Sequence, residues 1–234
     1  MRITIPVALI LAAASAACGQ DAAPDKAALQ QKLADLKASV AANKAKLAKY
    51  QWLQTTQVAI KGETKKQENF QCKYGPDGKV QKTLVGPPPE PKAPPGGLKG
   101  KLVAKKVEEM KDYTDRLQSL ISHYAPPDPQ RLQASAKAGK ASLAPGEGTA
   151  TLIFADYYKP GDKVTFSFDT AAKRLLAYNV DTYLDDPKKD VVTLNNHFTT
   201  LDDGTNYLQQ TALDATGKEI KITTTNQGHS LIPK

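Results

Sequence analysis

The sequence predicts an α+β fold, an unclosed antiparallel β half-barrel of about nine strands with helices covering one face. From residue 148 onward, short segments with alternating apolar and polar residues are separated by turn residues, which is typical of an antiparallel meander. Two stretches with helical spacing of apolar residues lie before residue 50 and after residue 97. Apolar side chains fall on one face of most strands, so a single sheet covered on one side is expected.

The first 17 residues have the three parts of a secretory signal peptide. Arg2 supplies the positive charge, residues 3–14 form an apolar run, and residues 14–17 have small side chains. The run is shorter than the roughly 20 apolar residues that a membrane-spanning helix needs. We therefore expect an exported protein with a signal peptide over residues 1–17, a polar tether over 18–24 and one domain over 25–234.

Cys18 directly follows the small residues, and Ala16-Ala17-Cys18 resembles the lipobox of bacterial lipoproteins. The resemblance implies acylation of Cys18, and Gly19 in place of Asp implies anchoring at the outer membrane. The only other cysteine is Cys72, and two cysteines can pair in an oxidising periplasm. The sequence leaves acylation of Cys18 and a Cys18–Cys72 disulfide both open.

A long amphipathic helix is predicted over residues 25–49, because its larger apolar residues recur every three or four positions. The period then changes to two, which predicts a first strand ending at residue 60 and further strands over about 65–74 and 80–85. Residues 75–78 read Gly-Pro-Asp-Gly, a strong hairpin turn because Pro fixes φ and Asp-Gly tolerates positive φ.

A proline-rich segment over residues 86–97 holds six prolines and three glycines, which predicts an extended loop. Helical spacing returns over 98–124, and a short helix is predicted over 128–138, so residues 98–139 form a helical insertion. Lys99, Lys101, Lys105 and Lys106 make the first turns of this insertion basic. The helix dipole favours anions there, so these lysines either serve another role or are simply solvated.

Six consecutive strands separated by short turns are predicted in the C-terminal part of the chain. They cover residues 149–158, 163–169, 174–184, 191–201, 205–214 and 219–225. In the second of these strands Val164, Phe166 and Phe168 share one face. Such alternation predicts a sheet with one apolar side and one polar side.

The order of these elements resembles the LolA/LolB-like half-barrel class. The likeness is closest at residues 50–56, which enter the first strand, and at 74–79 in the hairpin turn. That class includes periplasmic lipoprotein carriers, outer-membrane lipoprotein receptors and RseB-type stress regulators. The proline-rich loop and the basic helix depart from the lipoprotein carriers.

The resemblance implies an apolar concave face that helices cover only in part, leaving a cavity suited to acyl chains. Candidate lining residues are Trp52, Phe154, Phe166, Phe168, Tyr178 and Val180. The same side chains can instead pack directly beneath the helices, and the sequence does not separate the two arrangements.

No catalytic motif is present in the sequence. His123, His197 and His229 lack metal-ligand spacing, and there is no phosphate-binding loop, nucleophile elbow or His-Glu-x-x-His motif. The net charge of +8 suits anionic lipid or cell-wall surfaces, whereas nucleic acid is not expected in an exported compartment. We therefore expect no enzymatic activity, no cofactor and no metal.

The expected function is that of a monomeric, non-catalytic envelope lipoprotein that binds a hydrophobic ligand such as lipid or acyl chains. It would be anchored to the outer membrane through Cys18. The alternative is a protein-interaction or regulatory module of the periplasm that presents the basic helix and the proline-rich loop to another envelope protein.

Overall fold

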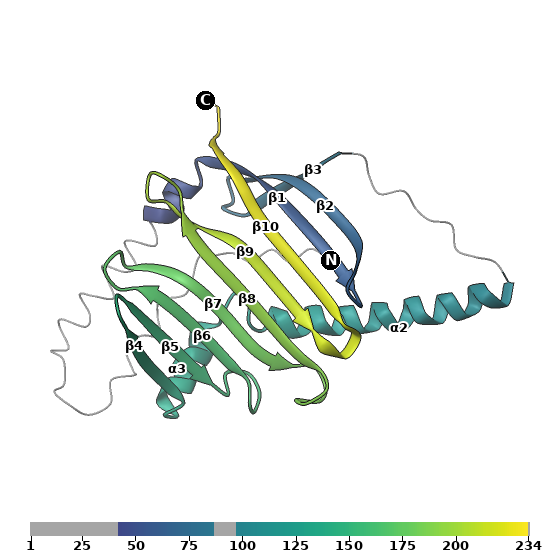
Figure 1. Ribbon diagram of the computed structural model, residues 1–234. Coiled ribbons are helices and arrows are strands. Elements are labelled where there is room, and N and C mark those ends of the chain that lie inside the picture. Colours follow the sequence, from purple (N-terminus) through teal and green to yellow (C-terminus); the bar gives the residue numbers. More distant parts are fainter. Residues whose placement is uncertain (1–41, 87–96, 234) are drawn as a thin grey trace.

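A ten-stranded antiparallel sheet dominates the computed structural model, which describes residues 42–86 and 97–233 (Figure 1). Its strands are β1 (Tyr50–Ile60), β2 (Glu63–Tyr74), β3 (Val80–Val85), β4 (Ala141–Gly146), β5 (Thr149–Ala155), β6 (Lys163–Asp169), β7 (Arg174–Tyr183), β8 (Val191–Thr200), β9 (Asn206–Ala215) and β10 (Ile220–Leu231). The helices are α2 (Gly97–Ser122) and α3 (Pro129–Lys137), with a 3-10 turn η1 (Thr216–Lys218). Residues 42–47 are also helical and lead into β1.

The strand order is β3-β2-β1-β10-β9-β8-β7-β6-β5-β4, so the first and last strands lie side by side inside the sheet. β1 pairs with β10 from Tyr50 opposite Leu231 to Ile60 opposite Ile220. β3 and β4 form the two edges and do not pair with each other, so the sheet is unclosed. The predicted unclosed antiparallel sheet is therefore confirmed.

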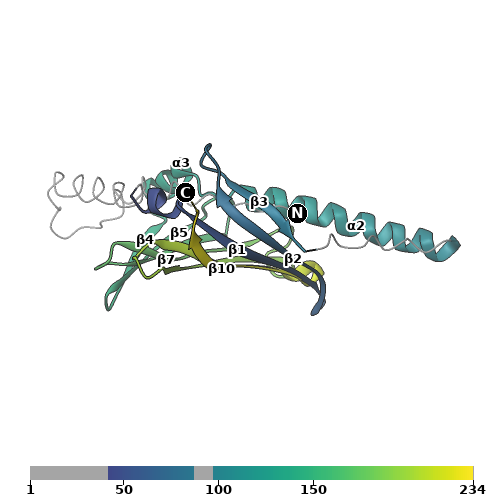
Figure 2. The same cartoon turned by 90° about the horizontal axis from the view of Figure 1, so that it is seen from above.

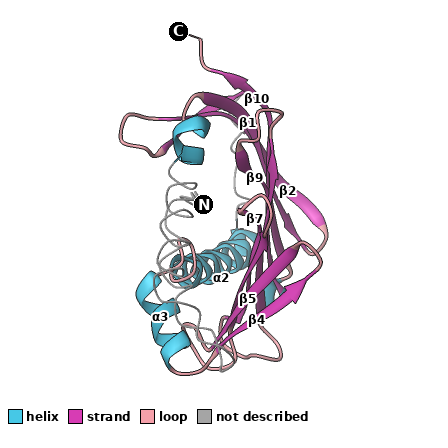
Figure 3. Ribbon diagram, turned by 90° about the vertical axis from the view of Figure 1, so that its left-hand side faces the viewer, coloured by secondary structure: helices cyan, strands magenta, loops and turns pink. Residues whose placement is uncertain are grey.

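One face of the sheet carries the core. Along β8 the side chains of Val192, Leu194 and Phe198 are buried, while those of Asn195 and His197 are exposed. Figure 3 shows α2 and α3 on one side of the sheet. The core between these layers contains apolar residues of α2 and α3 together with residues from β5 to β10. The alternating pattern of the strands thus sets which face the helices cover.

The helix α2 has two different halves. Every described side chain from residue 103 to 109 is exposed, and Val107 exposes 61% of its surface. Tyr113, Leu117 and Leu120 in the second half are buried against the sheet. The first half projects beyond the strands, as the view from above shows (Figure 2). Only the C-terminal half of α2 therefore contributes to the core.

Two buried tyrosine–carboxylate hydrogen bonds connect α2 and the residues just after it to loops between the strands. The hydroxyl of Tyr113 donates to Oδ1 of Asp190 at 2.6 Å, and that of Tyr124 donates to Oδ2 of Asp162 at 2.6 Å. The Asp162 carboxylate also accepts three consecutive backbone N–H groups, from residues 157–159. Because a buried carboxylate needs hydrogen-bond donors, these two pairs favour one placement of the helical region on the sheet.

The sheet has one strand more than the nine expected from the sequence. β4 pairs with β5 from Ala141 opposite Phe154 to Gly146 opposite Thr149. Its sequence, Ala-Ser-Leu-Ala-Pro-Gly, contains two residues that are depleted in strands. Proline is tolerated on an edge strand, where one row of N–H groups needs no partner, so position rather than propensity makes this segment a strand.

Several expectations concern residues outside the described part of the chain. These are the signal peptide over residues 1–17, the tether over 18–24, most of the helix expected over 25–49, and the proline-rich segment over 87–96. Of the basic turns in α2, the side chains of residues 97–102 are likewise not described. Within the described ranges, no helix combines the length and the apolar character needed to cross a membrane.

Candidate ligand-binding pocket

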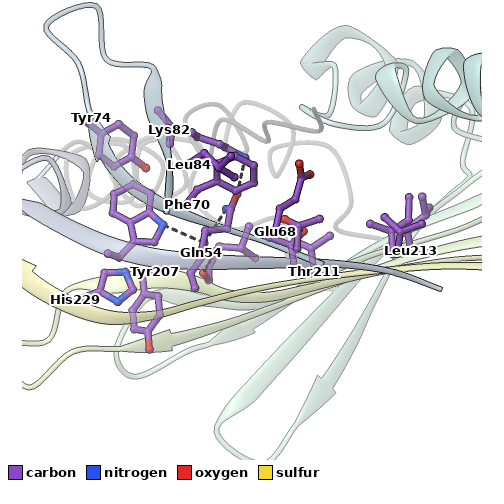
Figure 4. A pocket seen from close by; sticks show the side chains of 18 of the residues that line it. Gln54, Glu68, Phe70, Tyr74, Lys82, Leu84, Tyr207, Thr211, Leu213 and His229 are labelled. Atoms are coloured by element: carbon purple, nitrogen blue, oxygen red, sulfur yellow. Dashed lines mark hydrogen bonds between the residues drawn. The ribbon is translucent and has the colours of Figure 1, made fainter. Parts of the chain in front are cut away.

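A pocket of about 540 Å³ lies over the half of the sheet formed by β1, β2, β3, β9 and β10 (Figure 4). This volume falls in the range of about 300–1,000 Å³ that is typical of small-molecule sites. The described lining residues are Leu47, Trp52, Gln54, Thr56, Val58, Lys66, Glu68, Phe70, Tyr74, Val80, Lys82, Leu84, Tyr207, Leu208, Thr211, Leu213, Ile222, Thr224, Asn226 and His229.

Aromatic side chains from four neighbouring strands form a row at one end of the pocket. Trp52 lies 5.4 Å from Tyr74 and 5.7 Å from His229, measured between ring centroids, and the His229 ring lies 4.1 Å from that of Tyr207. The pairing of β1 with β10 is irregular between Gln51 and Leu53, beside Trp52. Burial lowers the pKa of His229 to about 4, so its ring is neutral at neutral pH.

The floor of the pocket is a polar network centred on Asn226. Its Oδ1 accepts hydrogen bonds from Nε1 of Trp52 at 3.0 Å and from Nε2 of Gln54 at 2.8 Å. Its Nδ2 donates to the carbonyl of Leu208 at 2.8 Å, and Nζ of Lys82 donates to Oε1 of Gln54. Both amide side chains are therefore held in fixed orientations by protein partners.

The hydroxyl groups of the floor also have protein partners. The hydroxyls of Thr56 and Thr224 are 3.3 Å apart, and that of Thr211 donates to Oδ1 of Asn196 at 2.8 Å. In the described part of the chain, buried side-chain atoms without a partner occur only on Arg174, Thr205 and Asn206, none of which lines this pocket. Because the floor is already paired, an apolar group can lie over it at little cost in lost hydrogen bonds.

The far end of the pocket is apolar and borders the core. Val58, Leu213 and Ile222 line it, and all three contact or belong to the core cluster beneath α2. Leu213 lies at the opposite end from Tyr74 and His229 (Figure 4). The pocket thus runs from an aromatic end, over a polar floor, to an aliphatic end.

Charged groups stand on the β2–β3 wall. Nζ of Lys66 forms an ion pair with Oε2 of Glu68 at 2.9 Å. Nζ of Lys82 lies 5.9 Å from the ring centroid of Phe70, and Figure 4 shows Lys82, Phe70 and Leu84 gathered above Gln54. The described lining therefore carries two lysines against one glutamate.

The candidate cavity residues from the sequence occupy two different places. Trp52 lines the pocket. Phe154, Phe166, Tyr178 and Val180 are buried in the core beneath the helices, and Phe168 packs against that core while partly exposed. The sequence did not indicate the partners of Trp52 on β10, Asn226 and His229, because the pairing of the first strand with the last carries no local signal.

Cys72 lies on β2 opposite Trp52, and its side chain is fully buried. Burial raises the pKa of the Cys72 thiol to about 11, so the thiol form dominates at neutral pH. A protonated, buried thiol is a poor nucleophile. Cys18 lies outside the described residues, so its acylation and its pairing with Cys72 both stay predictions.

The described ranges contain no group of three or more side chains placed to hold a metal ion. Comparison of the chain with protein-family models, with curated proteins and with solved structures gave no match. The case for a function therefore depends on the pocket and on the sequence.

Proposed function

We propose that this protein is a non-catalytic ligand-binding protein of the cell envelope, and that its pocket holds a hydrophobic or amphiphilic ligand such as a lipid. The observation that carries the proposal is the pocket of about 540 Å³, lined by aromatic and aliphatic side chains over a floor whose polar groups are already paired. The helices α2 and α3 fill the other half of the same face with core packing.

Two further observations support the proposal. The unclosed antiparallel sheet with helices on one face is the architecture that the resemblance to LolA/LolB-like half-barrels implies. Most residues that line the pocket also lie outside the buried cluster beneath the helices, which the pocket borders only at its aliphatic end.

Trp52 provides a direct test, because it is the only tryptophan of the chain and lies in the pocket. We expect single-chain lipids to change its fluorescence in a saturable way, and native mass spectrometry to show one lipid per protein molecule. Recovery of the protein without lipid from gentle extraction, together with no saturable change on titration, would refute the proposal.

A pair of matched variants localises the binding. Thr56→Phe places a ring inside the pocket, whereas Thr55→Phe places the same ring on the opposite face of β1. Thr56→Phe should weaken lipid binding at least about tenfold, and Thr55→Phe should leave it within about twofold. Equal effects of the two variants would place the ligand elsewhere.

We also propose export, acylation of Cys18 and attachment to the outer membrane. The signal-like residues 1–17 and the Ala16-Ala17-Cys18 sequence support this localisation. Intact-mass analysis of the mature protein from the membrane fraction tests it, since acylation adds two or three acyl chains to Cys18. An unmodified mass would contradict acylation of Cys18. A decrease in electrophoretic mobility upon reduction would then favour the disulfide between Cys18 and Cys72.

A second candidate function is a protein-interaction module that uses the projecting half of α2. The observation in its favour is the exposure of Val103 (40%) and Val107 (61%) on that half. Replacing both valines by serine should abolish the recovery of an envelope partner in pull-down experiments, whereas Glu109→Ser should not.

Deleting the whole of residues 86–124 is a poorer test, because it also removes Leu117 and Tyr124 from the core. Partner recovery by the double-serine variant would refute this function.

A further inference from the structure

Two rows of uncharged side chains, the neutral rows, cross the outer face of the sheet, which is the face opposite α2 and α3 (Figure 3). Because side chains alternate between the two faces of a strand, residues that pair across neighbouring strands form rows on one face. The first row consists of Asn69, Thr55, Thr225, Gln210, His197, Ala177, Ser167, Thr151 and Ala144. The second row consists of Gln67, Gln57, Thr223, Ala212, Asn195, Asn179, Thr165, Ile153 and Ser142.

Charge is sorted on this face. Neither row contains Lys, Arg, Asp or Glu, although these residues make up 24% of the chain and belong mainly to exposed surface. Every residue of the rows is exposed or partly exposed. The charged side chains flank the rows, where Asp214 lies opposite Lys221, and Nζ of Lys163 forms an ion pair with Oδ2 of Asp181 at 3.0 Å. The neutral rows are therefore an accessible strip from which charges are absent.

The strip has hydrogen-bonding groups to offer a ligand. Toward its β2 end, the hydroxyl of Thr55 donates to Oδ1 of Asn69 at 2.8 Å. At its centre, the side-chain amides of Asn179, Asn195 and Gln210 have no hydrogen-bond partner among the residues that the structure describes. Each amide carries two N–H donors and one acceptor oxygen. The centre of the strip thus presents donors and acceptors side by side to the solvent.

The composition of the neutral rows disfavours the commonest macromolecular partners. Nucleic acids and anionic lipids are held by Lys and Arg, and neither occurs in the rows. Stable protein interfaces concentrate Tyr, Trp, Phe and Arg at their centre, and the rows contain none of these. The strip instead matches a partner that is extended, uncharged and rich in hydrogen-bonding groups.

We propose that the neutral rows bind an uncharged glycan chain that carries N-acetyl groups and lies across the strands. An N-acetyl amide pairs with an Asn or Gln side chain as both donor and acceptor, and the sugar hydroxyls use the remaining groups. Neighbouring strands are about 4.8 Å apart, so the rows repeat polar groups at regular steps, as an extended polymer requires. The rows share no residue with the pocket, so this inference does not depend on lipid binding.

The test measures how much of the full-length protein sediments with two insoluble polysaccharides. Chitin is an uncharged polymer of N-acetylglucosamine, and cellulose is the related polymer with hydroxyl groups in place of the N-acetyl groups. We expect saturable binding to chitin, with a Kd at least about tenfold lower than for cellulose. Because neither the strip nor the polymer is charged, the Kd should change less than about twofold between about 0.05 M and about 0.5 M salt.

The matched variants are two double substitutions that each convert two exposed amides into carboxylates. Asn195→Asp with Gln210→Glu alters the centre of the neutral rows. Gln118→Glu with Gln130→Glu makes the same change of charge on α2 and α3. The first variant should raise the Kd for chitin at least about tenfold, because it removes amide donors and places charge in the strip, and the second should leave it within about twofold. Circular dichroism and unfolding midpoints should be native in both, since all four residues are exposed.

Four outcomes would overturn the inference or one of its parts. The absence of binding to chitin by the native protein would overturn it entirely. Equal Kd values for chitin and cellulose would overturn the assignment to N-acetylated glycans. Binding that disappears at high salt would belong to the basic surface and not to the neutral rows. Native affinity in the variant with Asn195→Asp and Gln210→Glu would overturn the placement of the glycan on this face.

Discussion

At the scale of single residues, a few buried polar side chains determine how the helices and the sheet fit together. Asp162 is almost completely buried, yet its carboxylate accepts hydrogen bonds from three backbone N–H groups and from the Tyr124 hydroxyl. Burial and the hydrogen bond to Asp162 raise the pKa of Tyr124, so the hydroxyl remains a donor at all ordinary pH values. Such a pair fixes one geometry of the core.

Replacing Tyr124 by phenylalanine should therefore lower the free energy of unfolding by about 1.5–3 kcal/mol, the usual cost of a lost hydrogen bond to a charged group. Urea unfolding followed by circular dichroism measures the change. Tyr183→Phe is the control, because the exposed Tyr183 hydroxyl donates to the carbonyl of Pro160. That variant should stay within about 0.5 kcal/mol of the native protein, and equal losses in both variants would contradict the prediction.

His229 predicts a pH dependence of stability. Burial lowers its pKa from 6.5 to about 4 in the folded protein, so between these values the unfolded chain binds a proton that the folded chain does not. The free energy of unfolding should therefore decrease as the pH falls through this window. His229→Gln should flatten the decrease of the unfolding free energy between pH 6.5 and 5, as measured by urea unfolding at several pH values. Identical slopes in the native protein and the variant would rule out this contribution.

At the scale of elements, the sequence predicted best the segments whose local pattern matches their final environment. β6, β7 and β8 alternate cleanly and were predicted to within a residue or two, because one face of each is buried. α3 begins at a side-chain cap, in which Asp128 accepts from the N–H of Gln130, close to the start of the short helix expected over residues 128–138. Local chemistry was sufficient in these cases.

Other elements depend on distant partners. β10 continues to Leu231, six residues beyond its expected end at residue 225, because the second half of the strand pairs with β1. The candidate site was predicted only in part for the same reason. Trp52 was identified from its own segment, but its neighbour His229 comes from a strand more than 170 residues away. Nothing in the local sequence indicates that contact.

Replacing an apolar residue by alanine should affect the stability strongly in the C-terminal half of α2 and very little in its projecting half. Leu117 is fully buried beneath the helix, so Leu117→Ala should cost about 2–5 kcal/mol of stability. Val107 is exposed in the projecting half, so Val107→Ala should change the stability by less than about 0.5 kcal/mol. Denaturant unfolding of both variants measures the difference. A large loss of unfolding free energy in Val107→Ala would mean that the projecting half of α2 packs against another part of the protein.

At the scale of the whole molecule, the pocket exists only where the first and last strands meet. β1 and β2 supply one wall and β9 and β10 supply the other, so each wall depends on the β1–β10 ladder. Asn226 is the residue that joins them, because its side chain contacts β1 through Trp52 and Gln54 and contacts β9 through Leu208. The shape of the pocket therefore depends on the pairing of β1 with β10.

Asn226→Ala should weaken both properties together. The substitution leaves the Trp52 N–H, the Gln54 amide and the Leu208 carbonyl without their partner, which should cost at least about 2 kcal/mol of stability. It should also weaken lipid binding, since Gln54 no longer holds a fixed orientation beneath Lys82. The control is Gln227→Ala, one residue further along β10 and exposed. Unfolding midpoints and lipid titrations followed by Trp52 fluorescence test this coupling in both variants. If Asn226→Ala loses stability but keeps the native affinity for lipid, the pocket forms independently of this contact.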